Sequence, residues 1–209
     1  MDPKRIVEEG YDALGPEFGA WAHHNPGEVR SWFLEEVLAR VPPRADVLEL
    51  GCGPGVDAPA LSRGRSYTGV DLSEVQLSIA RAGVPGGTFV KGDLTAIDLP
   101  DASFDAVVSL YVFNHVPRDE QGPTFLRAFE WLRPGGVLSL SLEAGGHDGE
   151  IERGWLGRVD MYFAGNDVAD NERLLREAGF ELELSETKTE EESGGQTVTF
   201  HWAIGRKPD

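Results

Sequence analysis

The sequence contains one cysteine, Cys52, and no apolar run long enough to cross a membrane. A single thiol cannot form an internal disulfide, and zinc ribbons and dithiol redox centres need more than one cysteine. A transmembrane helix needs roughly 18 to 20 consecutive apolar residues, which no segment approaches. The first residues, MDPKRIVEEG, lack the apolar core of a secretory signal and carry acids that transit peptides avoid. We therefore expect a cytoplasmic protein without a membrane partner.

Basic residues are also scarce. The 209 residues include 19 Lys and Arg against 36 Asp and Glu, which gives a formal net charge of −17. A surface of that sign repels phosphate backbones, so we expect no nucleic-acid partner. Solubility is the simplest explanation of the acidity, and a preference for neutral or cationic ligands is the functional one.

Strand-length and helix-length segments alternate along a chain whose length suits one domain. Glycine, proline and aspartate separate them, and they predict helices at 3–22, 27–41, 55–63, 73–82, 119–132 and 171–178. Strands are predicted at 46–50, 66–71, 88–91, 104–110, 137–142, 180–185 and 197–204. The last two alternate as antiparallel strands do and are joined by an acidic turn, TEEESGGQ, whereas 143–163 has no clean period.

This alternation predicts an α/β fold with a doubly wound, mostly parallel sheet and helices on both faces. Ligands of such sheets bind at the carboxyl ends of the strands. The chemistry-bearing residues should therefore follow the strands directly.

A glycine-rich loop, VLELGCGPG, follows the first predicted strand and places Gly51 and Gly53 where the backbone can approach a ligand closely. A dinucleotide fingerprint would need its third glycine at position 56, which is Val56. Glu49, just ahead of the glycines, would repel a pyrophosphate. The loop therefore favours a cationic ligand over a nicotinamide dinucleotide.

Acids also follow the next two predicted strands. Asp71 ends the strand of YTGVDLS, where its carboxylate can accept both hydroxyls of a ribose or cap the helix that starts at Ser73. Asp93 follows the third strand in KGDLT. With Glu49, the sequence places three acids at the ends of successive strands around one glycine loop. Chance is a poor explanation of this arrangement.

These motifs resemble those of class I S-adenosylmethionine-dependent methyltransferases. VLELGCGPG, GVDLS, GDL, FDAVVSLYVFNHVP, LRPGG and RLLREAGFELEL occur in the family's order between Asp46 and Ile204. The resemblance implies a Rossmann-like sheet of seven strands with an antiparallel last strand. It also implies S-adenosylmethionine as cofactor and S-adenosylhomocysteine as product, held by Tyr11, Glu49, Gly51, Gly53, Asp71, Leu72, Gly92, Asp93, Leu94 and Ser109.

By the same resemblance, Glu49 would lie near the methionine ammonium, Asp71 on the ribose, and Asp93 and Leu94 at the adenine. Tyr11 would lie over the methionine end of the cofactor.

The segment after the fourth predicted strand narrows the acceptor. Enzymes that methylate adenine or glutamine amides carry Asp/Asn-Pro-Pro-Tyr there, where this chain has Ser109, Leu110, Tyr111 and Val112. Carbon-5 pyrimidine enzymes need a cysteine nucleophile after this strand, and none is present. Asn114 and Glu143 are too few oxygen ligands for a catechol-type metal site. We expect a small-molecule acceptor, methylated on oxygen or nitrogen, and no metal.

Two segments are predicted to cover the acceptor: an amino-terminal helical lid at 1–44 and an insert at about 143–163 in the core domain 45–209. Trp21, His24, Trp155 and Tyr162 are predicted to line the substrate pocket, because amphipathic rings suit a mostly apolar site. His115 is the predicted general base. The lid is too short for a large dimerisation domain, which favours a monomer or a weak homodimer.

Three alternatives remain open at this point. The cofactor can be used without methyl transfer, the protein can be a non-catalytic binding module, or the acceptor can be a peptide.

Overall fold

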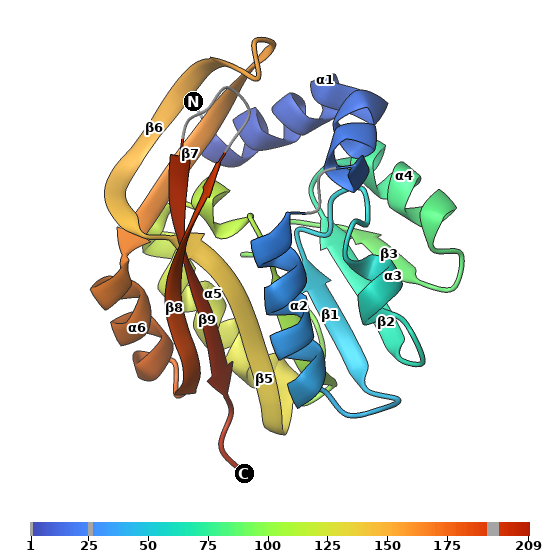
Figure 1. Cartoon of the computed structure of the whole chain (residues 1–209), viewed down its shortest axis with the longest axis vertical. Helices are drawn as coiled ribbons and strands as arrows, with labels where there is room; N and C mark the ends of the chain where they lie inside the picture. Colours follow the sequence, from blue (N-terminus) through green and yellow to red (C-terminus); the bar gives the residue numbers. More distant parts are fainter. Residues whose placement is uncertain (1, 25–26, 192–196) are drawn as a thin grey trace.

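A computed structural model of the chain describes residues 2–24, 27–191 and 197–209. Seven strands of the described chain form one sheet in the order β3-β2-β1-β4-β5-β9-β8 (Figure 1). The strands are β1 Asp46–Leu50, β2 Ser66–Asp71, β3 Thr88–Lys91, β4 Phe104–Ser109, β5 Leu132–Glu143, β8 Glu181–Glu191 and β9 Thr197–Arg206. Strands β1 to β5 pair in parallel, and β9 pairs antiparallel with both β5 and β8. The predicted Rossmann-like sheet with an antiparallel last strand is confirmed.

Helices cover both faces of this sheet, as predicted. They are α1 Pro3–His24, α2 Glu28–Arg40, α3 Ala58–Leu61, α4 Glu74–Gly83, α5 Arg118–Trp131 and α6 Val168–Glu177, with a short 3-10 helix, η1, at Phe113–His115. Fully buried Phe33 and Val37 of α2 pack in one hydrophobic cluster with Trp202. Phe125 and Trp131 of α5 belong to a second cluster. Burial of these large side chains holds the fold without any disulfide.

Residues 143–163, which show no clean period in the sequence, have regular structure. They belong largely to a hairpin of β6, Gly145–Trp155, and β7, Val159–Asp167, which forms its own two-stranded sheet. Its register shifts between His147 and Glu150 and again between Glu152 and Trp155. Because each shift moves the following side chains to the other face, the alternation that marks a strand is interrupted.

Several other boundaries differ from the sequence predictions. The helix expected at 55–63 is only Ala58–Leu61, since a turn with Gly55 at φ +79° precedes it. Helix α6 begins earlier than predicted because the Asp167 side chain accepts a hydrogen bond from the Asp170 amide and caps it. Strand β8 continues to Glu191, so the start of the predicted acidic turn is strand, and residues 192–196 of that turn lie outside the described residues.

Helix α1 is broken in the middle. Gly15 has φ 59° and ψ −151°, and Pro16 follows it. Proline disfavours helical backbone in the residue before it and has no amide hydrogen to donate, so the helix changes direction here. Helix α1 and the β6–β7 hairpin, which we call the roof, lie across one end of the seven-stranded sheet (Figure 1). No helix within the described residues is long and apolar enough to cross a membrane.

Candidate active site

A cavity of about 1060 Å³ lies between the roof and the carboxyl ends of the parallel strands. Its floor includes the loop after β1 and the residues that follow β2, β3 and β4, as parallel-sheet topology predicts. Predicted residues that line it are Tyr11, Trp21, Gly51, Gly53, Asp71, Leu72, Gly92, Asp93, Leu94, His115 and Trp155.

The glycine loop needs glycine for two different reasons. Gly51 has φ +68°, and a Cβ there would come within 2.4 Å of the Val112 side chain. Gly53 has φ +50°, and a Cβ there would meet nothing within 4 Å. Since Gly53 lines the cavity, its missing side chain leaves space for a ligand against the backbone.

Asp71 is held beside this loop by backbone amides. One carboxylate oxygen accepts a hydrogen bond from Gly53 N at 2.7 Å, and the other accepts one from Ser73 N at 2.8 Å. Burial raises the pKa of Asp71 to about 6, although the two amides oppose that shift. Ser73 also caps α4 by accepting a hydrogen bond from Gln76 N. Asp71 therefore braces the start of α4 and also lines the cavity.

Asp93 is bound by a lysine of α1. Lys4 Nζ lies 2.8 Å from an Asp93 oxygen, 2.6 Å from Thr95 Oγ1 and 2.5 Å from a Glu120 oxygen. Burial alone would raise the pKa of Asp93, but hydrogen bonds from Lys4 and Thr95 hold it below its ordinary value. Lys4 thus ties the first turn of the roof to the end of β3.

Tyr11 and His115 form a hydrogen-bonded pair in the cavity wall. His115 Nδ1 lies 2.8 Å from the carbonyl oxygen of Tyr162, and its Nε2 lies 3.0 Å from Tyr11 Oη. A carbonyl only accepts, so Nδ1 carries the proton and Nε2 accepts from the Tyr11 hydroxyl. Burial lowers the pKa of His115 to about 4, and burial together with the Asp71 charge raises that of Tyr11. At neutral pH the imidazole is therefore uncharged and the phenol protonated.

Comparisons with known proteins agree with this geometry. Residues 47–136 match the family model described as a methyltransferase domain. The chain is 30% identical over 213 residues to 27-O-demethylrifamycin SV methyltransferase of Amycolatopsis mediterranei, covering 86% of this chain and 75% of that protein. The chain belongs to the class I S-adenosylmethionine-dependent methyltransferases.

Two further comparisons concern the length of the chain relative to its relatives and its fold. A Mycolicibacterium smegmatis protein named as a probable S-adenosylmethionine-dependent methyltransferase is 32% identical over 167 residues, which are 75% of this chain and 62% of that protein. The chain thus spans less than two thirds of that relative's length. A Methanosarcina mazei methyltransferase structure has a TM-score of 0.74 at 20% identity, covering 83% of this chain and 97% of the other, and supports the fold.

The cavity fits the cofactor of this methyltransferase family. The glycine loop offers open backbone at Gly53, and Asp71 stands beside it as a carboxylate that can accept ribose hydroxyls. No Lys or Arg belongs to the loop, in keeping with a cofactor that carries a sulfonium and no phosphate. Gln76 also lines the cavity, and its buried Oε1 has no hydrogen-bond partner among the described residues.

Four predicted site residues do not line the cavity. Glu49 is 3% exposed and accepts a hydrogen bond from the Tyr67 hydroxyl. Burial and the nearby Asp57 charge raise its pKa well above the ordinary value. Ser109 is fully buried, where its hydroxyl donates to the Leu50 carbonyl at 2.9 Å and joins β4 to β1.

The other two belong to the roof. His24 is exposed, and its Nδ1 lies 2.6 Å from the Ala20 carbonyl one turn earlier in α1. Tyr162 contributes its backbone carbonyl to His115 instead of lining the cavity with its ring. The structure thus gives Tyr162 a part in the site, through a different group.

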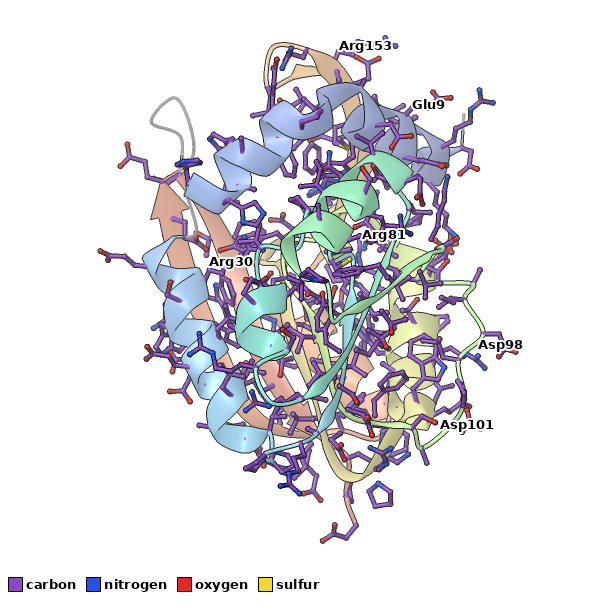
Figure 2. The ribbon with its side chains drawn as sticks, turned by 90° about the vertical axis from the view of Figure 1, so that its right-hand side faces the viewer. Glu9, Arg30, Arg81, Asp98, Asp101 and Arg153 are labelled. Carbon is purple, nitrogen blue, oxygen red and sulfur yellow. The ribbon has the colours of Figure 1, made fainter. Side chains whose placement is uncertain are left out.

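Two further residues of the site, Gln76 and Arg30, were not predicted. Gln76 donates through Nε2 to the carbonyls of Tyr11 and Gly15, at 3.0 and 3.1 Å, and so fixes the break in α1. Arg30 of α2 pairs with Asp57 at 3.0 Å and lines the cavity beneath α1 (Figure 2). The position of Gln76 three residues after Ser73, inside the first turn of α4, is the one signal that could have revealed its place beside the loop.

Aromatic rings form the outer wall. The ring centroid of Tyr11 lies 5.1 Å from that of Phe18 and 6.0 Å from that of Trp155, and the Phe163 ring lies 4.9 Å from that of His115 at a tilt of 43°. Trp21 lines the mouth and is 47% exposed. Within the described residues, no group of three or more His, Cys, Asp or Glu side chains could hold a metal ion.

Proposed function

We propose that this protein transfers the methyl group of S-adenosylmethionine to a small-molecule acceptor, at oxygen or nitrogen, by in-line displacement. The observation that carries the proposal is the Tyr11–His115 pair, which lines the same cavity as the glycine loop. The sulfonium supplies an activated methyl group when it is bound. What the chain must add is placement of the acceptor, exclusion of water and a path for a proton.

Placement is the largest contribution expected of the protein. Holding two reactants at near-attack distance can supply roughly 7 to 11 kcal/mol. The rings of Tyr11, Phe18 and Trp155 would confine an acceptor against the carboxyl end of β4, while α1 and the hairpin cover the site from water. An enclosure of this kind suits a small molecule better than a folded partner.

The Tyr11–His115 pair also provides a path for a proton. Tyr11 donates its hydroxyl hydrogen to His115 Nε2, so the Tyr11 oxygen keeps lone pairs that can accept a hydrogen bond from an acceptor O–H or N–H. As the acceptor loses its proton to Tyr11, Tyr11 can pass its own to His115. The Tyr162 carbonyl holds the imidazole in the orientation that this relay needs.

The test is a reaction with methyl-labelled S-adenosylmethionine and a panel of alcohols, phenols and amines. We expect label in the acceptor and S-adenosylhomocysteine in equal amount. Labelled cofactor that binds but yields neither product with any acceptor would contradict methyl transfer. Conversion of the acceptor without S-adenosylhomocysteine would indicate that the cofactor acts without giving up its methyl group.

A further inference from the structure

One wall of the cavity combines aromatic rings with carboxylates. Glu143, the last residue of β5, pairs across the sheet with Phe200 of β9. The ring centroid of Phe200 lies 5.0 Å from that of Tyr111, whose hydroxyl donates to Glu190 at 2.9 Å. All four residues line the cavity. Two rings therefore stand between two carboxylates along a continuous surface, which we call the acidic wall.

The basic residues of the cavity already form ion pairs with acids of the protein. Among its described lining residues, eight are Asp or Glu and two, Lys4 and Arg30, are Lys or Arg. Lys4 is bound by Asp93 and Glu120, and Arg30 is bound by Asp57. Arg30 also lies 5.1 Å from the centre of the Tyr111 ring, so this ring already interacts with a cation.

The acids on the roof side of the cavity differ from these basic residues. In the described part of the chain, Glu143, Glu150 and Glu152 form no ion pair with any Lys, Arg or His. Glu150 and Glu152 pair across the hairpin with Phe163 and Met161, and both glutamates line the cavity. Glu150 and Glu152 are exposed and Glu143 is partly buried. Carboxylates gathered around a cavity raise the local concentration of cations.

A separate observation concerns hydrogen-bond donors. Oδ1 of Asn114, which lies in η1 beside His115, is buried in the cavity lining and has no partner among the described residues. A buried acceptor without a donor costs free energy until a donor arrives. The lining thus has a surplus of acceptors and of negative charge, and both are complementary to N–H groups that carry a positive charge.

We propose that the acceptor is a cationic amine with an apolar or aromatic group, whose ammonium binds at the acidic wall while the apolar part packs on the roof aromatics. This proposal rests on the proposed function, since it names the substrate class of the same site. A carboxylate acceptor would be repelled by the same residues. A neutral alcohol would gain nothing from them.

The reaction keeps the charge balanced. Only the neutral amine carries a lone pair, so a bound ammonium first gives one proton to Tyr11 while Tyr11 passes its own proton to His115. Its nitrogen then forms a bond to the methyl carbon, the carbon–sulfur bond breaks, and that electron pair stays on sulfur. The positive charge ends on the methylated nitrogen, which the acidic wall again stabilises.

The test is calorimetry on protein saturated with S-adenosylhomocysteine, using three probes of matched size: 2-phenylethylamine, 2-phenylethanol and phenylacetate. We expect the amine to bind at least about 10-fold more tightly than the other two, with an affinity that falls as salt is added. Glu143→Gln should weaken amine binding by about 5- to 10-fold and leave alcohol binding unchanged. Glu35→Gln is the matched control, because it removes the same charge from an exposed position of α2 outside the cavity and should change neither.

Three results would contradict the expected binding of the amine. Phenylacetate binding as tightly as the amine, equal effects of Glu143→Gln on amine and alcohol, or no binding of any probe at millimolar concentration would overturn the amine proposal. Failure of S-adenosylhomocysteine itself to bind would instead overturn the proposed function. The two proposals can therefore fail separately.

Discussion

The half of the cavity around the glycine loop and the half that we propose binds the acceptor hold their charges differently. Around the glycine loop, Asp71 accepts two backbone amides and Asp93 is bound by Lys4. On the acceptor side, Glu143, Glu150 and Glu152 form no ion pair among the described residues. Carboxylates fixed in advance suit a ligand whose shape never varies. Carboxylates without a basic partner leave negative charge for a ligand to neutralise.

The halves also differ in which atoms face the ligand. Backbone at Gly51 and Gly53 shapes the first, whereas side chains of the roof and of η1 shape the second. A substitution in the first half should therefore act on cofactor binding, and one in the second on turnover or acceptor binding.

The largest effect is expected from Gly53→Val. At φ +50° a valine is strained, and its side chain would occupy the open space beside the loop, so S-adenosylhomocysteine binding should be lost while the sheet stays folded. Gly64→Val is the matched control, because Gly64 has φ +71°, meets nothing within 4 Å and lies outside the cavity. Calorimetry and circular dichroism on both variants decide this. Equal loss of binding in both would mean that backbone strain, and not the filled cavity, is responsible.

Next in size are the changes in the acceptor half. His115→Ala and Tyr11→Phe should each lower turnover by about 100- to 10,000-fold if the acceptor must lose a proton, with little change in cofactor affinity. Tyr162→Phe should have no such effect, because Tyr162 acts through its carbonyl. Turnover and S-adenosylhomocysteine affinity measured on all three variants separate the roles. A parallel fall of both quantities in His115→Ala would make His115 a support for the cofactor.

Asp71→Ala should weaken cofactor binding by about 1.5 to 3 kcal/mol, or about 10- to 150-fold, because the ribose loses a charged acceptor. Titration calorimetry on wild type and variant measures the difference. Unchanged affinity would remove Asp71 from the cofactor site.

The pKa of Asp71 adds a dependence on pH. Because burial raises this pKa from 3.8 to about 6 in the folded protein, the stability it contributes is present below about pH 4 and lost as pH rises through 6. The wild type should therefore lose stability relative to Asp71→Asn between about pH 4 and about pH 7. Denaturant unfolding of both proteins across this range measures the difference. A gap that stays constant with pH would contradict the buried, titrating carboxyl.

The smallest effect is expected from Lys4→Met, which keeps most of the length of the side chain and removes its charge. Half-exposed ion pairs contribute little, so stability should change by less than about 1 kcal/mol. The amides of α1 should nevertheless exchange hydrogen faster, since Lys4 joins α1 to Asp93 and Glu120. Arg5→Met removes an exposed pair within α1 and serves as control. Equal exchange in the two variants would show that Lys4 does not hold the roof.

The contrast between the two halves of the cavity also explains how much of the site the sequence could predict. The sheet, the glycine loop and the acids at 71 and 93 follow directly from strand ends, so local patterns suffice to place them. Tyr11 and His115 were both predicted as site residues, but they lie 104 residues apart and their bond depends on the break in α1 at Gly15. No local pattern could reveal that bond.

The β6–β7 hairpin is the part of the site that the sequence could not predict. Its two register shifts and its glycines at positive φ, among them Gly146, Gly149 and Gly154, remove the alternation by which strands are recognised. Consequently Glu150 and Glu152 could not be assigned to one face of a strand, and their place in the cavity became visible only in the structure. Ser109 shows that a family motif position can also serve the sheet alone.

The most direct test of the central claim is calorimetric titration of the wild-type protein with S-adenosylhomocysteine and, separately, with NAD. The open backbone at Gly53, the carboxylate of Asp71 beside it and the absence of Lys and Arg from the loop predict one S-adenosylhomocysteine bound per chain and no NAD. Binding of NAD, or no binding of S-adenosylhomocysteine to folded protein, would contradict the account.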